Sequence, residues 1–280
     1  MRMTRRARVI AGIAAVAAAA AVLSGCSNSS KSSNSTAGSG TPEKGGTVRY
    51  AEYPGSYPTW IWPLVPPNQD STENVGGFMY QFYRPLYFWG TNNKVALDES
   101  TSIGETPVWS NGGKTVTVTL KDYKWSNGEA VDGQDVLFWI NMAKTEGPLG
   151  NLAYYTAPNP KLGAKYFPDN VVSATASGQT FTLNLDKAYN QTWFLDDELS
   201  QITPMPMAWD MTSATAKGSC ASATLDTPAM KTACAADYAY LSKQAALGSS
   251  FVSSPLWTVI DGPFKLKSYN ATTEIGRAHV

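Results

Sequence analysis

Histidine, cysteine and charged side chains are scarce in this 280-residue sequence. The one histidine, His279, stands within the last three positions, so chemistry built on a histidine base depends on that residue alone. The patterns G-x-S-x-G and H-E-x-x-H and a glycine-rich phosphate loop are also missing. A glycosidase that uses two carboxylates needs none of these, so a secreted hydrolase of that kind stays open.

Charged residues make up 16% of the chain, below the roughly 25% of average domains. The sequence contains no basic patch of the kind that would indicate nucleic-acid binding. Aromatic residues are abundant, with 9 Trp and 14 Tyr. This balance favours recognition of uncharged or mixed ligands through stacking and apolar contact.

The N-terminus has the order of an export signal. Residues 1–8 carry four arginines, residues 9–22 are small and apolar, and LSGC follows at residues 23–26. The apolar run is shorter than the about 20 residues of a membrane-spanning helix. LSGC resembles a bacterial lipobox, so we predict a lipoprotein signal peptide over residues 1–25 and acylation of Cys26. An ordinary signal peptide with a chance cysteine is the alternative.

Residues 26–44 are predicted to be the lipidated cysteine and a flexible tether. The stretch is rich in serine, glycine and asparagine and nearly free of apolar side chains. Such a composition cannot bury enough surface to fold. Without the signal peptide the chain has 18 basic and 22 acidic residues, a net charge of −4.

Two further cysteines, Cys220 and Cys234, form an even pair in an exported chain. We therefore predict a disulfide, worth about 3 kcal/mol in the chain-entropy model; two free thiols are the alternative. No histidine or further cysteine lies near them, so no metal site is expected.

The remaining sequence mixes strands and helices without strict alternation. Residues 45–53 read as a strand, and residues 53–70, with five prolines, read as a long loop. Apolar residues at helical spacing predict a helix over residues 71–87. Near the C-terminus, residues 234–246 predict a helix and residues 262–269 a last strand.

Two hairpins and a capped helix are predicted between these ends. Residues 107–120 turn at Asn-Gly-Gly, and residues 171–185 turn at Ser-Gly. A helix follows Asp132, with Asp135 three residues on as in a capping box. Together these elements indicate a mixed α/β (α+β) fold class.

These pieces, in this order, resemble family 5 of the solute-binding proteins of bacterial ABC importers. The most specific mark is NGGKTVTVTLKDYKWSNGEAVDGQDVLFWINM, residues 111–142. The weaker marks are GGTVRYAEY after the tether, FYRPLYFWG, and the pair ITPMP and DGPFKLKSY. The resemblance implies a periplasmic-binding-protein-like bilobal fold. It assigns residues 45–83 and 199–273 to an incomplete first lobe and residues 84–198 to an inserted domain, with the second lobe missing.

The family implies capture of a peptide or oligosaccharide between two lobes. Its expected partners are an ABC permease and ATPase complex, and its expected location is the outer face of the bacterial cytoplasmic membrane. No enzyme activity and no cofactor is implied, and the membrane contact is through the lipid anchor.

Aromatic and amide side chains near the expected cleft are the candidate ligand contacts. Main-chain recognition of peptides and stacking of sugar rings both occur in this family. Packing of the two tryptophans into the core, holding the proline-rich loop in place, is an equal alternative for that pair. The candidates are Trp60, Trp62, Asn68, Gln69, Tyr154 and Tyr155.

Two other motifs are interpreted as structural. Trp125 precedes an Asn-Gly turn and is expected to pack in the inserted domain rather than to face a ligand. The acidic run 196–198 is expected to be a solvated helix face rather than a catalytic pair.

The last seven residues, EIGRAHV, match the in-frame translation of the start of a widely used sequencing adapter. We therefore expect residues 274–280, His279 included, not to belong to the natural protein, and the natural chain to continue after Thr273.

Overall fold

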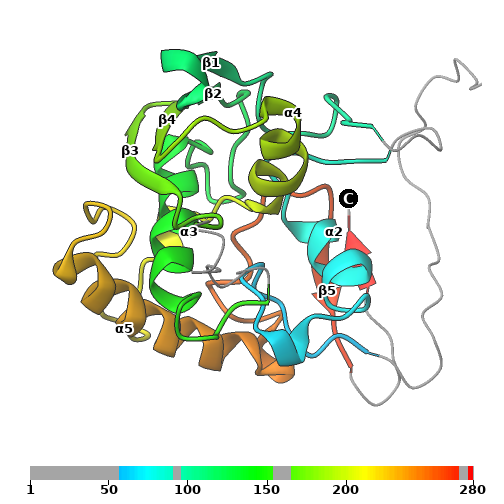
Figure 1. The fold of residues 1–280 in the computed structure, drawn as a ribbon. Coiled ribbons are helices and arrows are strands. Elements are labelled where there is room, and N and C mark those ends of the chain that lie inside the picture. Colours follow the sequence, from blue (N-terminus) through cyan, green and yellow to red (C-terminus); the bar gives the residue numbers. More distant parts are fainter. Residues whose placement is uncertain (1–56, 91–95, 154–164, 271–276, 280) are drawn as a thin grey trace, which may run out of the picture. The chain divides into compact units, whose positions relative to one another are not determined.

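The computed structural model describes residues 57–90, 96–153, 165–270 and 277–279 (Figure 1), and the account below concerns the unit Arg49–Val280. The predicted signal peptide, Cys26, the tether and the strand expected at residues 45–53 lie outside the described residues. The described elements are a mixture of helices and strands, as predicted.

Four antiparallel strands form the main sheet, in the order β1-β2-β4-β3. They are β1 (Val108–Ser110), β2 (Thr115–Thr119), β3 (Val171–Ser177) and β4 (Thr180–Leu185). Both predicted hairpins are confirmed. Their turns need left-handed backbone, which Gly112 (φ 65°) and Gly178 (φ 53°) supply without strain.

Alternation along β2 and β4 divides the sheet into a buried and a polar face. Val116 pairs with Leu183 and Val118 with Phe181, and all four side chains are fully buried. The threonines between them point to the other face because successive strand residues alternate. The apolar face of the sheet therefore supplies one wall of the core.

Helix α3 (Gly133–Glu146) lies between this sheet and helix α5 (Pro228–Ala245) (Figure 1). The predicted capping box is confirmed. The Asp132 side chain accepts hydrogen bonds from the backbone N–H groups of Gln134 and Asp135, and the Asp135 side chain accepts from the N–H of Asp132.

Helix α5 begins at Pro228, before the predicted start at residue 234. Thr227 caps it by accepting a hydrogen bond from the N–H of Met230 (3.1 Å), and proline suits the first helical position because its missing N–H would have no partner there. The sequence therefore contained a start signal that the apolar pattern alone did not reveal.

The helix predicted over residues 71–87 is wrong in length. Only η3 (Val75–Met79) and α2 (Tyr80–Phe82) form, and Tyr83 is extended (φ −125°, ψ 129°). The Phe82 carbonyl accepts the N–H of Gly262 (2.7 Å), a residue far along the chain, instead of continuing the helix. A tertiary hydrogen bond thus overrides the local helical pattern.

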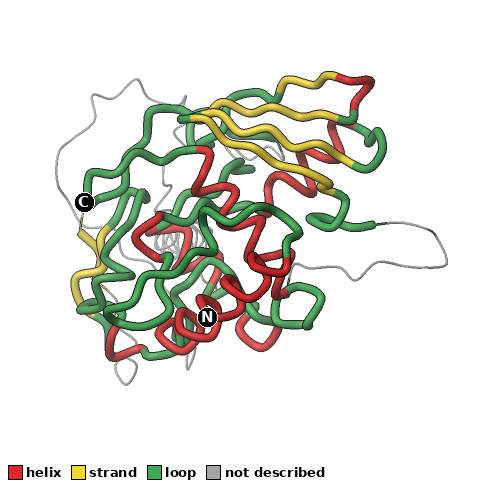
Figure 2. The backbone as a smooth tube through the Cα atoms, turned by 90° about the vertical axis from the view of Figure 1, so that its left-hand side faces the viewer, coloured by secondary structure: helices red, strands yellow, loops and turns green. Residues whose placement is uncertain are grey.

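A second, two-stranded sheet pairs β5 (Lys265–Ser268) antiparallel with β6 (Arg277–His279) (Figure 2). It confirms the strand predicted within residues 262–269 and places His279 opposite Lys265. The remaining helical turns are η2 (Pro67–Gln69), η4 (Asn111–Gly113), α4 (Gln191–Trp193), η5 (Phe194–Glu198), η6 (Leu199–Gln201), η7 (Met207–Trp209) and η8 (Gly248–Ser250).

Trp209 is the centre of an aromatic cluster that joins distant segments. Its ring lies 5.2 Å from that of Tyr83, 6.2 Å from Trp125 and 5.4 Å from Trp257, measured between centroids. Its indole N–H donates to the carbonyl of Leu256 (2.7 Å). Such a cluster ties four segments into one core.

Within the described ranges, no helix combines the length and the apolar character that crossing a bilayer requires. The predicted boundaries between a first lobe and an inserted domain stay a prediction.

Candidate functional site

One buried amide holds the proline-rich loop in place. The Asn74 side chain is 2% exposed; its oxygen accepts the N–H groups of Thr59 (2.8 Å) and Trp60 (3.2 Å), and its nitrogen donates to the carbonyl of Gln69 (2.8 Å). Both arms of the loop 57–70 are thereby fixed to one point. The sequence showed Asn74 only as a position within the helix predicted over residues 71–87, because a contact with residues as far away as Thr59 leaves no local pattern.

Trp60 and Trp62 both lie in the core, 3% and 0% exposed. The indole N–H of Trp60 donates to the carbonyl of Trp62 (2.6 Å), and the ring of Trp62 lies 5.5 Å from that of Tyr238. The structure therefore favours the alternative in which the two tryptophans pack into the core and hold the proline-rich loop in place. Neither ring presents an open face for stacking a sugar.

The two amide candidates differ in accessibility. Asn68 is exposed, whereas Gln69 is half-buried and its side-chain oxygen accepts the hydroxyl of Thr59 (2.6 Å). Gln69 thus helps to fix the loop, and Asn68 is free to meet a ligand. Tyr154 and Tyr155 lie outside the described residues. The N–H of Ala153 donates to the carbonyl of Val65 (2.8 Å), which brings the chain just before them beside the loop.

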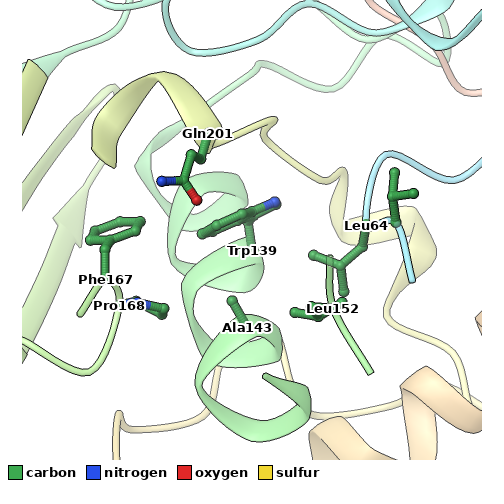
Figure 3. Close-up of a pocket in the computed structure, with 8 residues that line it drawn as sticks. Leu64, Trp139, Ala143, Leu152, Phe167, Pro168 and Gln201 are labelled. Atoms are coloured by element: carbon green, nitrogen blue, oxygen red, sulfur yellow. The ribbon is translucent and has the colours of Figure 1, made fainter. Parts of the chain in front are cut away.

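A small apolar pocket opens next to this loop (Figure 3). Trp139 of α3 stacks on Phe167 with ring centroids 6.0 Å apart and an interplanar angle of 23°. The lining residues are Leu64, Val65, Trp139, Ala143, Leu152, Phe167, Pro168 and Gln201. All but Gln201 are apolar and buried, so the pocket is a narrow apolar crevice with room for about one water molecule.

Two polar groups border the pocket. Gln201 donates its side-chain N–H to the carbonyl of Asp197 (2.7 Å), which leaves its side-chain oxygen on the side of Trp139 (Figure 3). The indole N–H of Trp139 is buried and has no hydrogen-bond partner among the described residues. The Gln201 oxygen therefore borders an apolar wall, whereas the Trp139 N–H is enclosed by the protein.

The acidic run near the pocket is only partly a solvated face. Asp196 and Asp197 are exposed, as expected, but Glu198 is 4% exposed, which corrects the prediction for this residue. Burial, and then the neighbouring charge of Asp197, raises the pKa of Glu198 to about 7. The π-helical geometry of η5 turns Glu198 inward, and no local pattern announces that geometry.

Cys220 and Cys234 are joined by a disulfide with 4.6 Å between their Cα atoms, and both are fully buried. Among the residues that the structure describes, no group of three or more histidine, cysteine or acidic side chains is arranged to hold a metal ion.

The structural interpretation of Trp125 is confirmed. The side chain is 2% exposed, and its indole N–H donates to the Asp135 carboxyl group (2.7 Å). Gly128 makes the turn that follows with φ 94°. The tryptophan therefore anchors a turn to the start of α3 and is not a ligand platform.

The chain belongs to the bacterial extracellular solute-binding proteins, family 5, whose middle region matches residues 100–276, more than half of the sequence. The resemblance found in the sequence is thereby confirmed. No curated protein matched.

Several solved structures are similar to this chain, at low sequence identity. The oligopeptide-binding protein AppA from Bacillus subtilis, in complex with a nonapeptide, is 15% identical, with a TM-score of 0.47; 76% of this chain and 32% of that one are covered. Haemophilus influenzae OppA, complexed with RPPGFSPFR, is 19% identical, with a TM-score of 0.45 and 76% and 34% covered. NikZ from Campylobacter jejuni, in complex with Ni(L-His), is 18% identical, with a TM-score of 0.41 and 75% and 31% covered. The chain thus spans about a third of the length of these structures.

Proposed function

We propose that this protein is the substrate-binding component of an ABC importer, anchored by a lipid on Cys26 to the outer face of the cytoplasmic membrane. It captures peptides and delivers them to a permease and ATPase complex. The observation that carries this proposal is the family match over residues 100–276, because family 5 proteins are extracellular solute binders. The order of basic residues, apolar run and LSGC supports the anchor.

The chemistry of the pocket favours a peptide over an oligosaccharide. Sugar rings are stacked on exposed aromatic faces, but Trp60, Trp62 and the pocket residue Trp139 are all buried, so none of them offers such a face. The pocket offers an apolar wall around the Trp139–Phe167 stack, with the Gln201 oxygen as an acceptor at its border. An apolar peptide side chain is chemically compatible with this lining. We therefore propose this pocket as a side-chain subsite.

Filling the pocket tests this proposal. Ala143 lines it from α3 and is 2% exposed, so Ala143→Leu adds volume inside the pocket at a stability cost of about 1–3 kcal/mol. Ala236→Leu adds the same volume on the exposed side of α5 and is the matched control. Binding is measured by fluorescence titration with peptides that carry apolar, charged or no large side chains, and with oligosaccharides.

We expect apolar peptides to bind the unmodified protein and the control alike, and to bind Ala143→Leu at least about tenfold more weakly. Equal affinity of all three proteins for every peptide would reject the pocket as a subsite while leaving the importer role standing. Binding of oligosaccharides alone would overturn the peptide assignment. Cleavage of a glycan would instead favour the hydrolase alternative.

A further inference from the structure

Two carboxyl groups, Asp210 and Asp237, meet inside the protein beneath the loop of residues 211–219. Asp210 follows η7 and is 7% exposed, and Asp237 lies in the middle of α5 and is fully buried. A Cβ atom on Gly218 would lie 2.2 Å from Oδ1 of Asp237 and 2.3 Å from Oδ1 of Asp210. Both oxygens therefore reach the same space above the Cα atom of Gly218, and only glycine fits there.

Hydrogen bonding around the pair is incomplete. Oδ1 of Asp210 accepts the N–H of Cys220 (3.1 Å), but neither carboxyl oxygen of Asp237 receives a donor from another described residue. Two ionised carboxylates are acceptors only, so they cannot bond to each other. When one of them is protonated, its O–H donates to the other, and the buried negative charge is reduced to one.

No cation in the described part of the chain neutralises the pair. Besides the pair itself, the charged groups on α3, on α5 and in the segment between residues 211 and 227 are Asp135, Lys144, Glu146, Lys217, Asp226, Lys231 and Lys243, of which Lys243 is exposed. Lys144 donates to the carbonyl of Val171 (2.6 Å) and pairs with Asp226 (2.8 Å), while Lys217 and Lys231 are exposed.

Nearby tyrosines on α5 do not serve the pair either. Tyr238 donates its hydroxyl to the carbonyl of Asn151 (3.1 Å), and Tyr240 is half-buried on the same helix. Burial, and then Asp210, raises the pKa of Asp237 to about 9. The charged group that acts on Asp237 is therefore Asp210.

We propose that Asp210 and Asp237 share one proton and thereby act as a latch that fastens the loop 211–219 to α5. Asp210 also accepts two hydrogen bonds from backbone N–H groups at the end of this loop. The N–H of Gly218 donates to the Asp210 carbonyl (2.7 Å), and the N–H of Cys220 donates to the Asp210 side chain. Loss of the shared proton places two negative charges side by side in the interior, and the loop opens to admit water between them.

The direction of the pH effect follows from the raised pKa. The folded protein keeps a proton that the unfolded chain, with a carboxyl pKa near 3.8, has lost. The contribution of the latch is therefore fully present below about pH 4 and is lost as the pH rises toward about 9. Each pH unit in this window lowers the folding equilibrium constant by up to about tenfold.

Unfolding of the full chain by urea, measured from about pH 5 to about pH 9, tests the latch. Asp237→Asn replaces the protonated carboxyl with an amide that donates to Asp210 at every pH. Asp122→Asn removes an exposed carboxyl group and is the matched control. We expect the folding equilibrium constant of the wild type, divided by that of Asp237→Asn, to fall as the pH rises. The folding equilibrium constant of the wild type divided by that of Asp122→Asn should stay constant over the same pH range. Parallel curves for wild type and Asp237→Asn overturn the proposal.

Hydrogen exchange at the amides of Gly218 and Cys220 is a second readout, and its result in the wild type alone can reject the latch. After correction for the intrinsic effect of pH, protection at both amides should fall in the wild type between about pH 6 and about pH 9 and persist in Asp237→Asn. Unchanged protection in the wild type rejects the latch. Restored protection on addition of Ca²⁺ at alkaline pH also rejects it, because the pair would then be a cation site.

Discussion

The indole N–H of Trp125 donates to the carboxyl group of Asp135 over 2.7 Å, and this bond ties the Asn-Gly turn to the first turn of α3. The same carboxyl group accepts the N–H of Asp132 (3.2 Å). One buried side chain thus closes the capping box and positions the aromatic that packs on Trp209. Trp139, which lines the pocket, lies one helical turn further along α3. The position of its side chain in the pocket therefore depends on where this helix begins.

Removal of this carboxyl group should therefore destabilise the protein. Asp135→Ala leaves two donors without a partner and should lower the free energy of unfolding by about 2–4 kcal/mol. Asp135→Asn keeps an acceptor oxygen and should cost less. Urea unfolding measures both; an alanine variant as stable as Asp122→Asn would contradict the role given to Asp135.

The pH dependence of the same variants has a definite sign. Burial is the main cause that raises the pKa of Asp135, to about 8, against an ordinary value of 3.8. Its proton-linked stability is therefore present below about pH 4 and is lost as the pH rises toward 8. Asp135→Asn should remove this part of the pH slope, and an unchanged slope would show that the carboxyl group is ionised throughout.

The close approach of Gly262 to α2 predicts a second effect on stability. A Cβ atom at residue 262 would lie 2.4 Å from the carbonyl carbon of Phe82 and 2.6 Å from its oxygen, and backbone cannot move aside cheaply. Gly262→Ala should cost about 2–3 kcal/mol. Gly76, in η3, has nothing within 4 Å of that position, so Gly76→Ala should be neutral or stabilising by about 0.5–1 kcal/mol. Equal effects of the two substitutions, measured by thermal unfolding, would contradict this contact.

These contacts show what the sequence could predict and what it could not. Both hairpins and α3 were predicted because their signals are local: alternation, glycine turns, and a capping box that Asp132 opens. The length of α2 was not, because the Phe82 carbonyl bonds to Gly262 far along the chain. The pocket was missed for the same reason. Its stacked pair, Trp139 and Phe167, comes from separate elements, and no local pattern links the two residues.

The disulfide between Cys220 and Cys234 should be present in the exported protein. It closes a loop of 14 residues, so the double substitution to serine should lower the free energy of unfolding by about 3 kcal/mol. Intact-mass analysis after alkylation, with and without reductant, checks the bond directly. Alkylation of both residues without reductant would mean that the exported chain carries free thiols.

Acylation of Cys26 should decide where the protein resides. Cys26→Ala removes the lipid site that LSGC predicts, so the protein should move from the membrane fraction to the soluble fraction of the cell. Substitution of Ser27, the next residue, by alanine is the control and should leave it in the membrane fraction. Membrane association that survives Cys26→Ala would reject the anchor.

The central claim is that this protein binds peptides and does not transform them. Calorimetric titration of the protein produced from its own gene, with apolar peptides, followed by mass analysis of the peptide recovered, tests it most directly. The account predicts a saturable heat of binding and an intact peptide. Absence of binding by every peptide in the series, or recovery of cleaved peptide, would contradict it.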